Sequence, residues 1–243
     1  MARSKSGRRG PGLAEPGRIV DDAIAAATSW GAVHLEVILL RHGQPKPDAR
    51  RRADERLDPP LSELGRRQAE VTGTLLSTEP VTAVYTSDLD RAAQTARIVA
   101  DALGLSSRPV PQLREIELGG AVTATGAGLD AAGWHRAAAE FATGGRWDTL
   151  VPAEPGPQFR DRVRAAIGAI AARHGTDRTN GTTVIACHNG VINAHLADVL
   201  GLDRDYALRP AHASLTRCWY AAGRWTVYSV NETAHLAAEL RTS

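Results

Sequence analysis

The stretch Leu35–Gln44 constrains the fold more than any other part of the chain. It reads Leu-Glu-Val-Ile-Leu-Leu-Arg-His-Gly-Gln, a short aliphatic and β-branched run that predicts a strand buried on both faces. The run stops at Arg41, His42 and Gly43, which supply a fixed cation, an imidazole and a residue that lets backbone approach a ligand. Ligands of open α/β sheets bind just outside the carboxyl ends of the strands. We therefore predict that Arg41 and His42 form the floor of an anion-binding site.

Two later stretches repeat this pattern of a strand that runs into charged or imidazole side chains. Val81–Ser87 is alternating and β-branched, and the helix predicted after it carries Arg91 in its first turn. Thr182–Cys187 is a third strand, and His188 follows it directly. The alternation of strands and helices predicts an α/β fold of three layers, α/β/α, with a mostly parallel sheet flanked by helices. Parallel strands end at a common edge, so both side chains should join those of the first strand there.

The rest of the sequence predicts one domain with an N-terminal extension. Residues 1–33 should be a flexible extension with a possible short helix near Ile19–Ser29, and residues 34–243 the folded domain. The other expected elements are a helix capped by Ser62, an irregular insertion from Gly119 to Pro157 with a helix near Trp134–Ala142, a helix over Phe159–Gly175, a hairpin about Ala222-Gly223 and a short closing helix. Such an insertion could cover a site.

Charge and composition exclude several classes of protein. The formal net charge is +2, from 29 basic and 27 acidic residues, which is too small to indicate nucleic-acid binding. No apolar run approaches the roughly 18 residues of a membrane span. Cys187 and Cys218 form neither a disulfide framework nor a zinc pattern. We expect a cytoplasmic protein without nucleic-acid or membrane partners, and the sequence leaves its oligomeric state open.

The predicted convergence of two arginines and two histidines suits phosphate chemistry. Guanidinium forks bind phosphate oxygens, and the helix after His188 could add backbone N–H donors from Asn189 or Gly190. An imidazole in such a pocket can attack phosphorus and hold the phosphoryl group covalently. The leaving alkoxide then needs a proton, and Glu115 and Glu117, just before the insertion, are the candidate donors.

Five blocks of sequence, in order, carry a recognisable pattern: Arg41-His42-Gly43-Gln44, Pro60–Ala69, Ser87–Ala92, Leu113-Arg114-Glu115 and His188–Ile192. Asn231–Leu236 adds a sixth near the end of the chain. Together they resemble the histidine phosphatase superfamily, in its phosphoglycerate mutase-like branch. One Arg-His-Gly is a weak signal, whereas five blocks at sensible spacing are specific, and the resemblance covers about residues 35–240.

The resemblance implies a phosphoglycerate mutase-like α/β fold and a phosphohistidine intermediate at His42, with no metal and no organic cofactor. It implies that the catalytic residues are His42, Glu115 and His188. It implies that a phosphorylated small-molecule substrate is bound by Arg41, Arg91, Gln44 and Asn189. Glu115, rather than Glu117, occupies the position that matches the proton donor of the family.

The resemblance leaves the reaction open between hydrolysis and transfer. In phosphoglycerate mutases an Asn-rich segment with Gly-Trp follows Arg-His-Gly, and here the basic loop Lys46–Arg56 replaces it. A mutase must retain and reorient a bisphosphorylated intermediate, whereas a phosphatase only admits water. We therefore predict a phosphomonoesterase acting on a sugar phosphate or phosphoglycerate-like metabolite. The alternatives are a phosphoglycerate mutase and a catalytically silent module that binds a phosphorylated ligand.

Several polar residues also have structural interpretations. Arg91 alone could be a surface arginine paired with Asp88. Six residues after Cys187 stands Asn193, which excludes the Cys-x5-Arg pattern of cysteine phosphatases. The basic loop could be a solvated charge run or a rim that attracts an anionic substrate. His212, just before the final hairpin, could approach the site, but the pattern favours no role for it.

Overall fold

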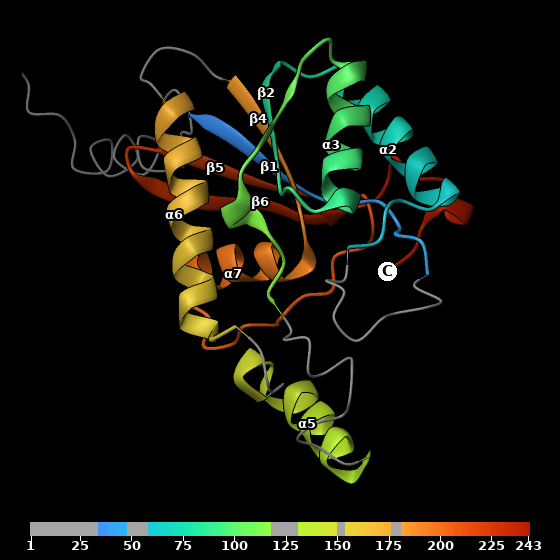
Figure 1. The fold of residues 1–243 in the computed structure, drawn as a ribbon. Helices are drawn as coiled ribbons and strands as arrows, with labels where there is room; N and C mark the ends of the chain where they lie inside the picture. The colour runs from blue at the N-terminus through green and yellow to red at the C-terminus, as the bar shows by residue number, and fades with distance from the viewer. Residues whose placement is uncertain (1–33, 48–57, 118–130, 150–153, 176–180) are drawn as a thin grey trace, which may run out of the picture. The chain divides into compact units, whose positions relative to one another are not determined.

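A six-stranded sheet organises the part of the chain that the computed structural model describes, residues 34–47, 58–117, 131–149, 154–175 and 181–243 (Figure 1). The strands are β1 (Leu35–Arg41), β2 (Val81–Thr86), β3 (Ser107–Pro109), β4 (Gly181–Cys187), β5 (Leu215–Ala221) and β6 (Arg224–Glu232). They lie in the order β3-β2-β4-β1-β5-β6. The pairs β1–β4, β2–β4 and β2–β3 are parallel, whereas β5 pairs with β1 and with β6 in the antiparallel sense. The sheet is therefore mostly parallel, as predicted.

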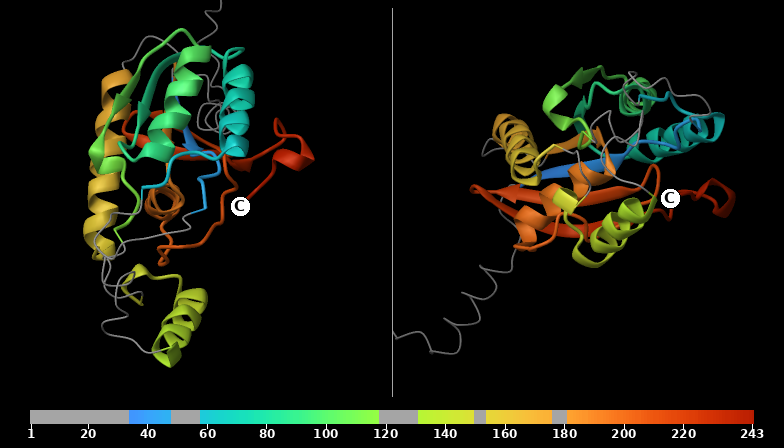
Figure 2. Two further views of the ribbon diagram at one scale, coloured as in Figure 1. Left: turned by 45° about the vertical axis from the view of Figure 1, so that its right-hand side comes forward. Right: turned by 60° about the horizontal axis from the view of Figure 1, so that its bottom comes forward.

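Helices cover both faces of this sheet (Figures 1 and 2). The helices are α2 (Glu63–Leu76), α3 (Asp90–Ala102), α5 (Ala131–Gly144), α6 (Gly156–His174) and α7 (Asn189–Leu200), with 3-10 turns η1 (Pro111–Leu113), η2 (Trp147–Thr149) and η3 (Ala238–Leu240). Helices α2 and α3 pack on one face, and α6 and α7 pack on the other. The predicted cap is present, since the Ser62 hydroxyl accepts the N–H of Gly65 at 3.0 Å at the start of α2.

Alternation along β1 separates two hydrophobic cores. Val37 and Leu39 face α6 and α7, whereas Ile38 and Leu40 face α2 and α3, and all four are fully buried. Positions of a strand that are buried under helices on both faces are apolar, as Val37–Leu40 are here. The continuous aliphatic run of β1 therefore confirms the predicted three-layer α/β/α architecture.

The structure differs from the sequence-based expectations in two elements. The short edge strand β3 was not predicted, because Ser107–Pro109 contains only three residues and ends in proline. The expected closing helix is the single 3-10 turn η3. The hairpin turns at Ala222 and Gly223, both with positive φ, as the sequence suggested.

Some expectations fall on residues outside the described ranges. They are the short helix near Ile19–Ser29, most of the basic loop and the start of the insertion at Gly119. The division into an extension and a domain stays a prediction; the described residues all belong to the unit His34–Ser243. None of the helices within them is long and apolar enough to cross a membrane.

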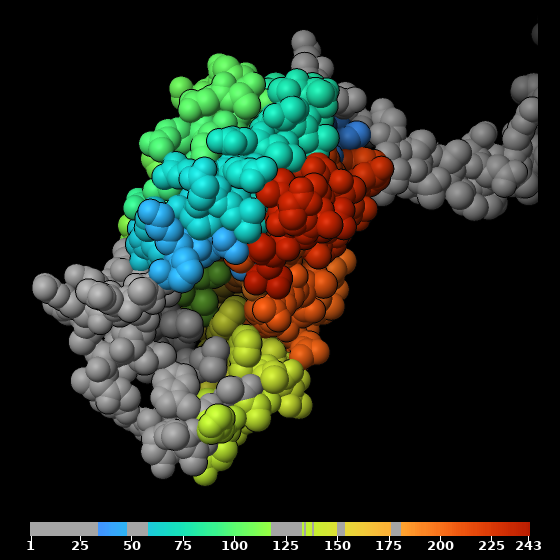
Figure 3. All heavy atoms as spheres, turned by 90° about the vertical axis from the view of Figure 1, so that its right-hand side faces the viewer, coloured from blue at the N-terminus to red at the C-terminus, as the bar shows by residue number. Residues whose placement is uncertain are grey.

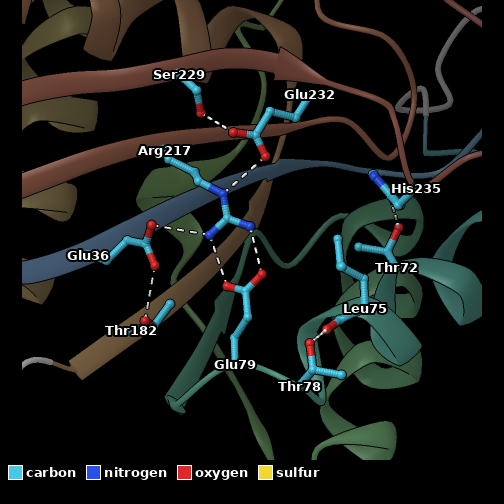
Figure 4. Close-up of polar contacts among 10 residues, drawn as sticks. All are labelled: Glu36, Thr72, Leu75, Thr78, Glu79, Thr182, Arg217, Ser229, Glu232 and His235. Carbon is cyan, nitrogen blue, oxygen red and sulfur yellow. Dashed lines mark hydrogen bonds and ion pairs between the residues drawn. The ribbon is translucent and has the colours of Figure 1, made fainter.

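A partly buried ion cluster joins the strands near the amino ends of β1 and β4 (Figure 4). Arg217 of β5 donates from Nη1 to Glu36 at 3.1 Å, from Nη2 to Glu79 at 2.7 Å and from Nε to Glu232 at 3.0 Å. Its side chain is only 12% exposed. These four residues are called the Arg217 cluster below, and they tie β1, β5, β6 and the α2–β2 connection together.

Candidate active site

The carboxyl ends of β1 and β4, away from the Arg217 cluster, place two histidines side by side. Arg41 and Cys187 are paired in register as the last residues of the two strands. The chain continues with His42 and His188, and the His42 N–H donates to the Cys187 carbonyl at 2.9 Å. The two imidazole rings lie 5.2 Å apart between centroids. The parallel pairing thus converts a separation of 146 residues into contact.

Helix α3 brings Arg91 to the same place from its first turn. Its Nε donates to Nε2 of His42 at 3.3 Å, and its Nη1 lies 3.6 Å from Asp58 Oδ1. Asp88, the surface partner considered for Arg91, is instead bound by Arg114 through Nε at 2.6 Å. We call Arg41, His42, Arg91 and His188 the anion pocket.

Gly43 allows α2 to approach the end of β1 closely. A Cβ atom on Gly43 would lie 2.4 Å from the Gly65 carbonyl oxygen, and one on Gly65 would lie 2.1 Å from the Gln44 carbonyl oxygen. The Gly43 N–H donates to the buried Thr95 hydroxyl at 3.0 Å. Backbone is therefore fixed on both sides of His42.

The surroundings of His42 define its protonation. Nδ1 lies 2.8 Å from the Gly43 carbonyl oxygen, which can only accept, so Nδ1 carries the proton. Nε2 accepts from Arg91, so it presents a lone pair. Burial, reinforced by the charge of Arg91, lowers the pKa of His42 well below its usual value. His42 is therefore a neutral imidazole with its proton on Nδ1 and a lone pair on Nε2.

Several buried polar atoms of the anion pocket have no hydrogen-bond partner among the described residues. They are Arg41 Nε, Arg91 Nη1, and both ring nitrogens of His188. His188 is fully buried, and burial followed by the charge of Arg91 lowers its pKa well below the usual value. Because buried polar groups are almost always hydrogen-bonded, this concentration of donors suits an anionic ligand with several oxygens.

Glu115 reaches the pocket from the segment after η1. Its Oε2 accepts the Gly190 N–H at 3.0 Å, and its Oε1 accepts the Ile116 N–H at 2.9 Å. A Cβ on Gly190 would lie 2.1 Å from Oε1, so a larger residue there would displace the Glu115 carboxylate from this position. Burial raises the pKa of Glu115, and the Gly190 hydrogen bond and the charges of Arg91 and Arg41 oppose the shift. Glu117, the other candidate donor, is exposed.

Arg162 of α6 fixes the backbone that carries Glu115. Its Nη1 donates to the carbonyls of Gln112 at 2.7 Å and Arg114 at 2.8 Å, and its Nη2 donates to that of Glu115 at 3.3 Å. Glu154 binds the same guanidinium through both carboxylate oxygens, at 2.6 and 2.7 Å. The proton-donor candidate is therefore held by a bidentate ion pair.

Gln44 and Asn189, the two remaining predicted site residues, have protein partners. The Gln44 side chain accepts the Ser62 hydroxyl at 2.8 Å. Asn189 donates to the Tyr206 hydroxyl at 3.0 Å and accepts from Asn193 at 2.7 Å. The Gly190 N–H, expected to point at the anion, is used by Glu115. Contact of both side chains with substrate stays a prediction.

His212 belongs to the site although the sequence pattern favoured no role for it. It is buried, its ring lies 5.6 Å from that of His42, and its Nε2 lies 3.2 Å from Arg41 Nη2. Because β5 is antiparallel to β1, the residues just before β5 lie beside the end of β1. The Arg41 N–H donates to the Ser214 carbonyl at 3.1 Å. The direction of β5 relative to β1 is therefore what brings His212 to the site, and local sequence does not show that direction.

Helix α5 and the chain after α7 border the site on another side. Phe141, Trp147 and Tyr206 pack against one another with ring centroids 4.9 to 5.6 Å apart. Asp205 accepts the Trp147 N–H at 3.0 Å and forms a buried ion pair with Arg160. Figure 3 shows the surface hollowed between the blue residues after β1, the yellow-green α5 and the orange-red last third of the chain.

A neutral nucleophilic imidazole, two guanidiniums and a carboxyl group with a raised pKa are the groups needed for covalent phosphoryl transfer with acid assistance. Within the described residues, no group of three or more His, Cys, Asp or Glu side chains is placed to hold a metal ion.

Comparison with known protein families gives one match that covers most of the chain. The histidine phosphatase superfamily (branch 1) matches residues 37–233. This range contains every residue of the anion pocket and Glu115.

Individual relatives carry both mutase and phosphatase names. The probable phosphoglycerate mutase GpmB of Yersinia enterocolitica is 31% identical over 212 residues, which cover 83% of this chain and 95% of that protein. A mycobacterial glucosyl-3-phosphoglycerate phosphatase structure is 27% identical, covers 82% of this chain and 99% of its own, and has a TM-score of 0.66. A phosphoglycerate mutase structure from Bacillus anthracis covers 84% and 96% with a TM-score of 0.68; at 22% identity it supports the fold alone.

Proposed function

The chain belongs to the histidine phosphatase superfamily, and we propose that it is a metal-independent phosphomonoesterase that hydrolyses a small phosphorylated metabolite through a phosphohistidine at His42. The observation that carries the proposal is the state of His42. Its proton is held on Nδ1 by the Gly43 carbonyl, and its Nε2 lone pair faces Arg91 inside a pocket of buried, unpartnered donors. A binding pocket alone would not need a neutral imidazole fixed in one tautomer.

The first step is attack of His42 Nε2 on phosphorus. The Nε2–P bond forms as the P–O bond to the alcohol breaks. Arg41 and Arg91 bind the non-bridging oxygens and stabilise the charge that develops on them. His188, neutral without substrate, donates a hydrogen bond to the phosphoryl group, and a bound dianion favours its protonation. The Gly43 carbonyl stabilises the positive ring of the phosphohistidine through Nδ1–H.

Glu115 supplies and recovers the proton. Its raised pKa increases the fraction of the enzyme in which Glu115 is protonated and can donate to the leaving alkoxide. In the second step its carboxylate takes a proton from the water that attacks the phosphohistidine. The N–P bond breaks, phosphate leaves, and His42 returns to its neutral state. Glu117 is exposed, which supports Glu115 as the donor.

The substrate we propose is a sugar phosphate or a phosphoglycerate-like ester. The neighbours named as a glucosyl-3-phosphoglycerate phosphatase and as phosphoglycerate mutases support this class. Both cysteines are buried and free, which supports a reducing, cytoplasmic setting.

A phosphoglycerate mutase is the second candidate, because the Yersinia relative carries that name. The replacement of the mutase segment by Lys46–Arg56 supports hydrolysis instead. Incubation with 3-phosphoglycerate, followed by phosphorus NMR, separates the two: a phosphatase releases inorganic phosphate, and a mutase produces 2-phosphoglycerate.

The direct test is mass spectrometry of acid-labile phosphate on His42 after millisecond mixing with a panel of phosphomonoesters, with phosphate release followed in parallel. We expect an adduct on His42 that forms and decays at rates compatible with turnover. His42→Asn is the control that should carry no adduct. Neither adduct nor phosphate release across the panel would favour a silent binding module.

A further inference from the structure

A continuous chain of hydrogen bonds runs through the C-terminal residues and joins the two sides of His42. The Gln44 N–H donates to Gln68 Oε1 at 2.8 Å, and Gln68 Nε2 donates to the Thr242 hydroxyl at 2.9 Å. The Thr242 hydroxyl lies 3.0 Å from His212 Nδ1, and His212 Nε2 lies 3.2 Å from Arg41 Nη2. Gln44 and Arg41 are thus connected in space by the penultimate residue of the sequence.

The direction of each bond in this chain is fixed by chemistry. A guanidinium can only donate, so His212 Nε2 accepts from Arg41 and the proton of the ring must be on Nδ1. That proton is donated to Thr242, whose two oxygen lone pairs then serve His212 and Gln68. Burial, with the charge of Arg41, lowers the pKa of His212 to about 4, so the ring is neutral near pH 7.

The same contacts fix the orientation of the Arg41 guanidinium. Nη1 donates to the Pro210 carbonyl and Nη2 donates to His212. Nε remains buried without a partner among the described residues. Because a guanidinium is planar and rigid, contacts on these two nitrogens also fix the direction of the Nε–H bond. The tautomer of His212 is essential, since an Nε2–H would face another donor.

We propose that Thr242 is a positioning residue of the anion pocket, which holds His212 in the tautomer that accepts from Arg41 and thereby orients the Arg41 guanidinium for phosphate. The inference rests on the proposed function only in naming phosphate as the ligand. A second anchor strengthens it: the His212 N–H donates to the Thr242 carbonyl at 2.8 Å, so ring and backbone of His212 are both tied to this residue. The C-terminal residues therefore belong to the site and are more than an end of the chain.

The test measures the Kd of inorganic phosphate by isothermal titration calorimetry, with kcat and KM for p-nitrophenyl phosphate in parallel. Thr242→Val keeps the shape and removes the two acceptor lone pairs; we expect Kd and KM to rise about fivefold with kcat changed less. Thr242→Ser should restore both values. His212→Ala should raise Kd about tenfold, because a bond to a charged group is lost. Ser243→Ala, the neighbouring exposed hydroxyl, is the matched control and should change neither.

The double variant decides whether Thr242 acts through His212. If it does, Thr242→Val added to His212→Ala leaves Kd near the tenfold loss of His212→Ala alone. Independent roles would multiply to about fiftyfold, and that result would overturn the proposal. An unchanged Kd in Thr242→Val, with only a lower unfolding midpoint, would overturn it as well. Phosphate binding is read without turnover, so an inactive wild-type enzyme would refute the proposed function and leave this inference tested separately.

Discussion

Two arginine clusters lie toward opposite ends of the same strands, one partly buried and one buried, and they differ in how fully they are hydrogen-bonded. In the Arg217 cluster one guanidinium is bound by three carboxylates from three parts of the chain (Figure 4). In the anion pocket Arg41 and Arg91 stand beside neutral histidines, and each keeps a buried nitrogen that has no hydrogen-bond partner among the described residues, although Arg91 Nη1 lies 3.6 Å from Asp58. The pKa values show the same contrast. Hydrogen bonds, first to Glu79 and then to Glu232, raise the pKa of Arg217, whereas burial lowers those of Arg41 and Arg91.

The contrast separates stability from function. Arg217 makes four hydrogen bonds to carboxylates and has little left for a ligand, and its removal leaves uncompensated charge on three glutamates. A cluster with unused buried donors is costly in the free protein and gains its partners from a ligand. We therefore expect substitutions in the Arg217 cluster to lower stability and to leave activity unchanged. Substitutions in the anion pocket should lower activity and leave stability nearly unchanged.

The largest expected effect is that of His42→Asn. Loss of the nucleophile should lower kcat by more than about 10⁴-fold, because the covalent route is closed. The unfolding free energy should change by no more than about 2 kcal/mol, since the hydrogen bond to the Gly43 carbonyl and the one from Arg91 Nε are both at stake. Steady-state kinetics and urea denaturation check the two halves. A large loss of stability would contradict the assignment of the anion pocket to function and not to stability.

Arg91→Met should lower kcat/KM by about 10²- to 10³-fold, because one charged donor to the developing phosphoryl charge is removed. Stability should change by about 1 kcal/mol or less, since the bond to His42 Nε2 and the 3.6 Å ion pair with the partly exposed Asp58 are lost while a buried charge is removed. Arg67→Met on the exposed face of α2 removes the same charge and should leave kcat/KM within about twofold. Equal losses of kcat/KM in the two variants would show that Arg91 acts only through its long-range charge.

Arg217→Met should lower the unfolding free energy by about 3 kcal/mol, because Glu36, Glu79 and Glu232 lose their common counter-charge. The value should be read from a shift in the urea midpoint at constant m-value. kcat for p-nitrophenyl phosphate should stay within about twofold at temperatures where the variant is folded. A variant that is stable but inactive would contradict the assignment of this cluster to stability.

Glu115→Gln should slow alkyl phosphates by about 10²-fold and p-nitrophenyl phosphate by less than about tenfold, because only the poor leaving group needs a proton. The pH dependence sharpens this. Activity requires His42 neutral and Glu115 protonated, so the wild-type rate should fall as pH drops below the lowered pKa of His42 and as it rises past the raised pKa of Glu115. Glu115→Gln should lose the alkaline limb. Equal losses on both esters would exclude Glu115 as the acid.

The smallest expected effect is a pH dependence of stability that comes from the anion pocket. The folded-state pKa values of His42 and His188 lie below the usual 6.5, so the unfolded chain binds more protons below that pH. Stability should therefore fall by about 1 kcal/mol per histidine between pH 6.5 and 5.5. Urea titrations at several pH values should show a flatter dependence in His188→Asn than in the wild type. An identical dependence of stability on pH in the two proteins would show that His188 does not contribute to the proton uptake on unfolding.

Much of the site could be predicted because its residues stand at the ends of strands. Arg41, His42 and His188 follow aliphatic runs, and parallel pairing brings such ends together whatever the loops between them do. The choice between Glu115 and Glu117 could not be made from spacing, since both precede the insertion. It depends on the approach of Gly190 and on the fixation of the backbone by Arg162, two contacts across more than 40 residues.

The sequence by itself determined the three-layer α/β fold, the strand ends that carry the anion pocket and the resemblance to one superfamily, because these depend on local periodicity and on motifs read in order. The tertiary structure alone decided the tautomer of His42, the donors left without partners, and the entry of His212 and Thr242 into the site. Protonation and orientation depend on which groups face each other across the packed interior, and that pairing is set by the polarity of β5 and the path of the last residues.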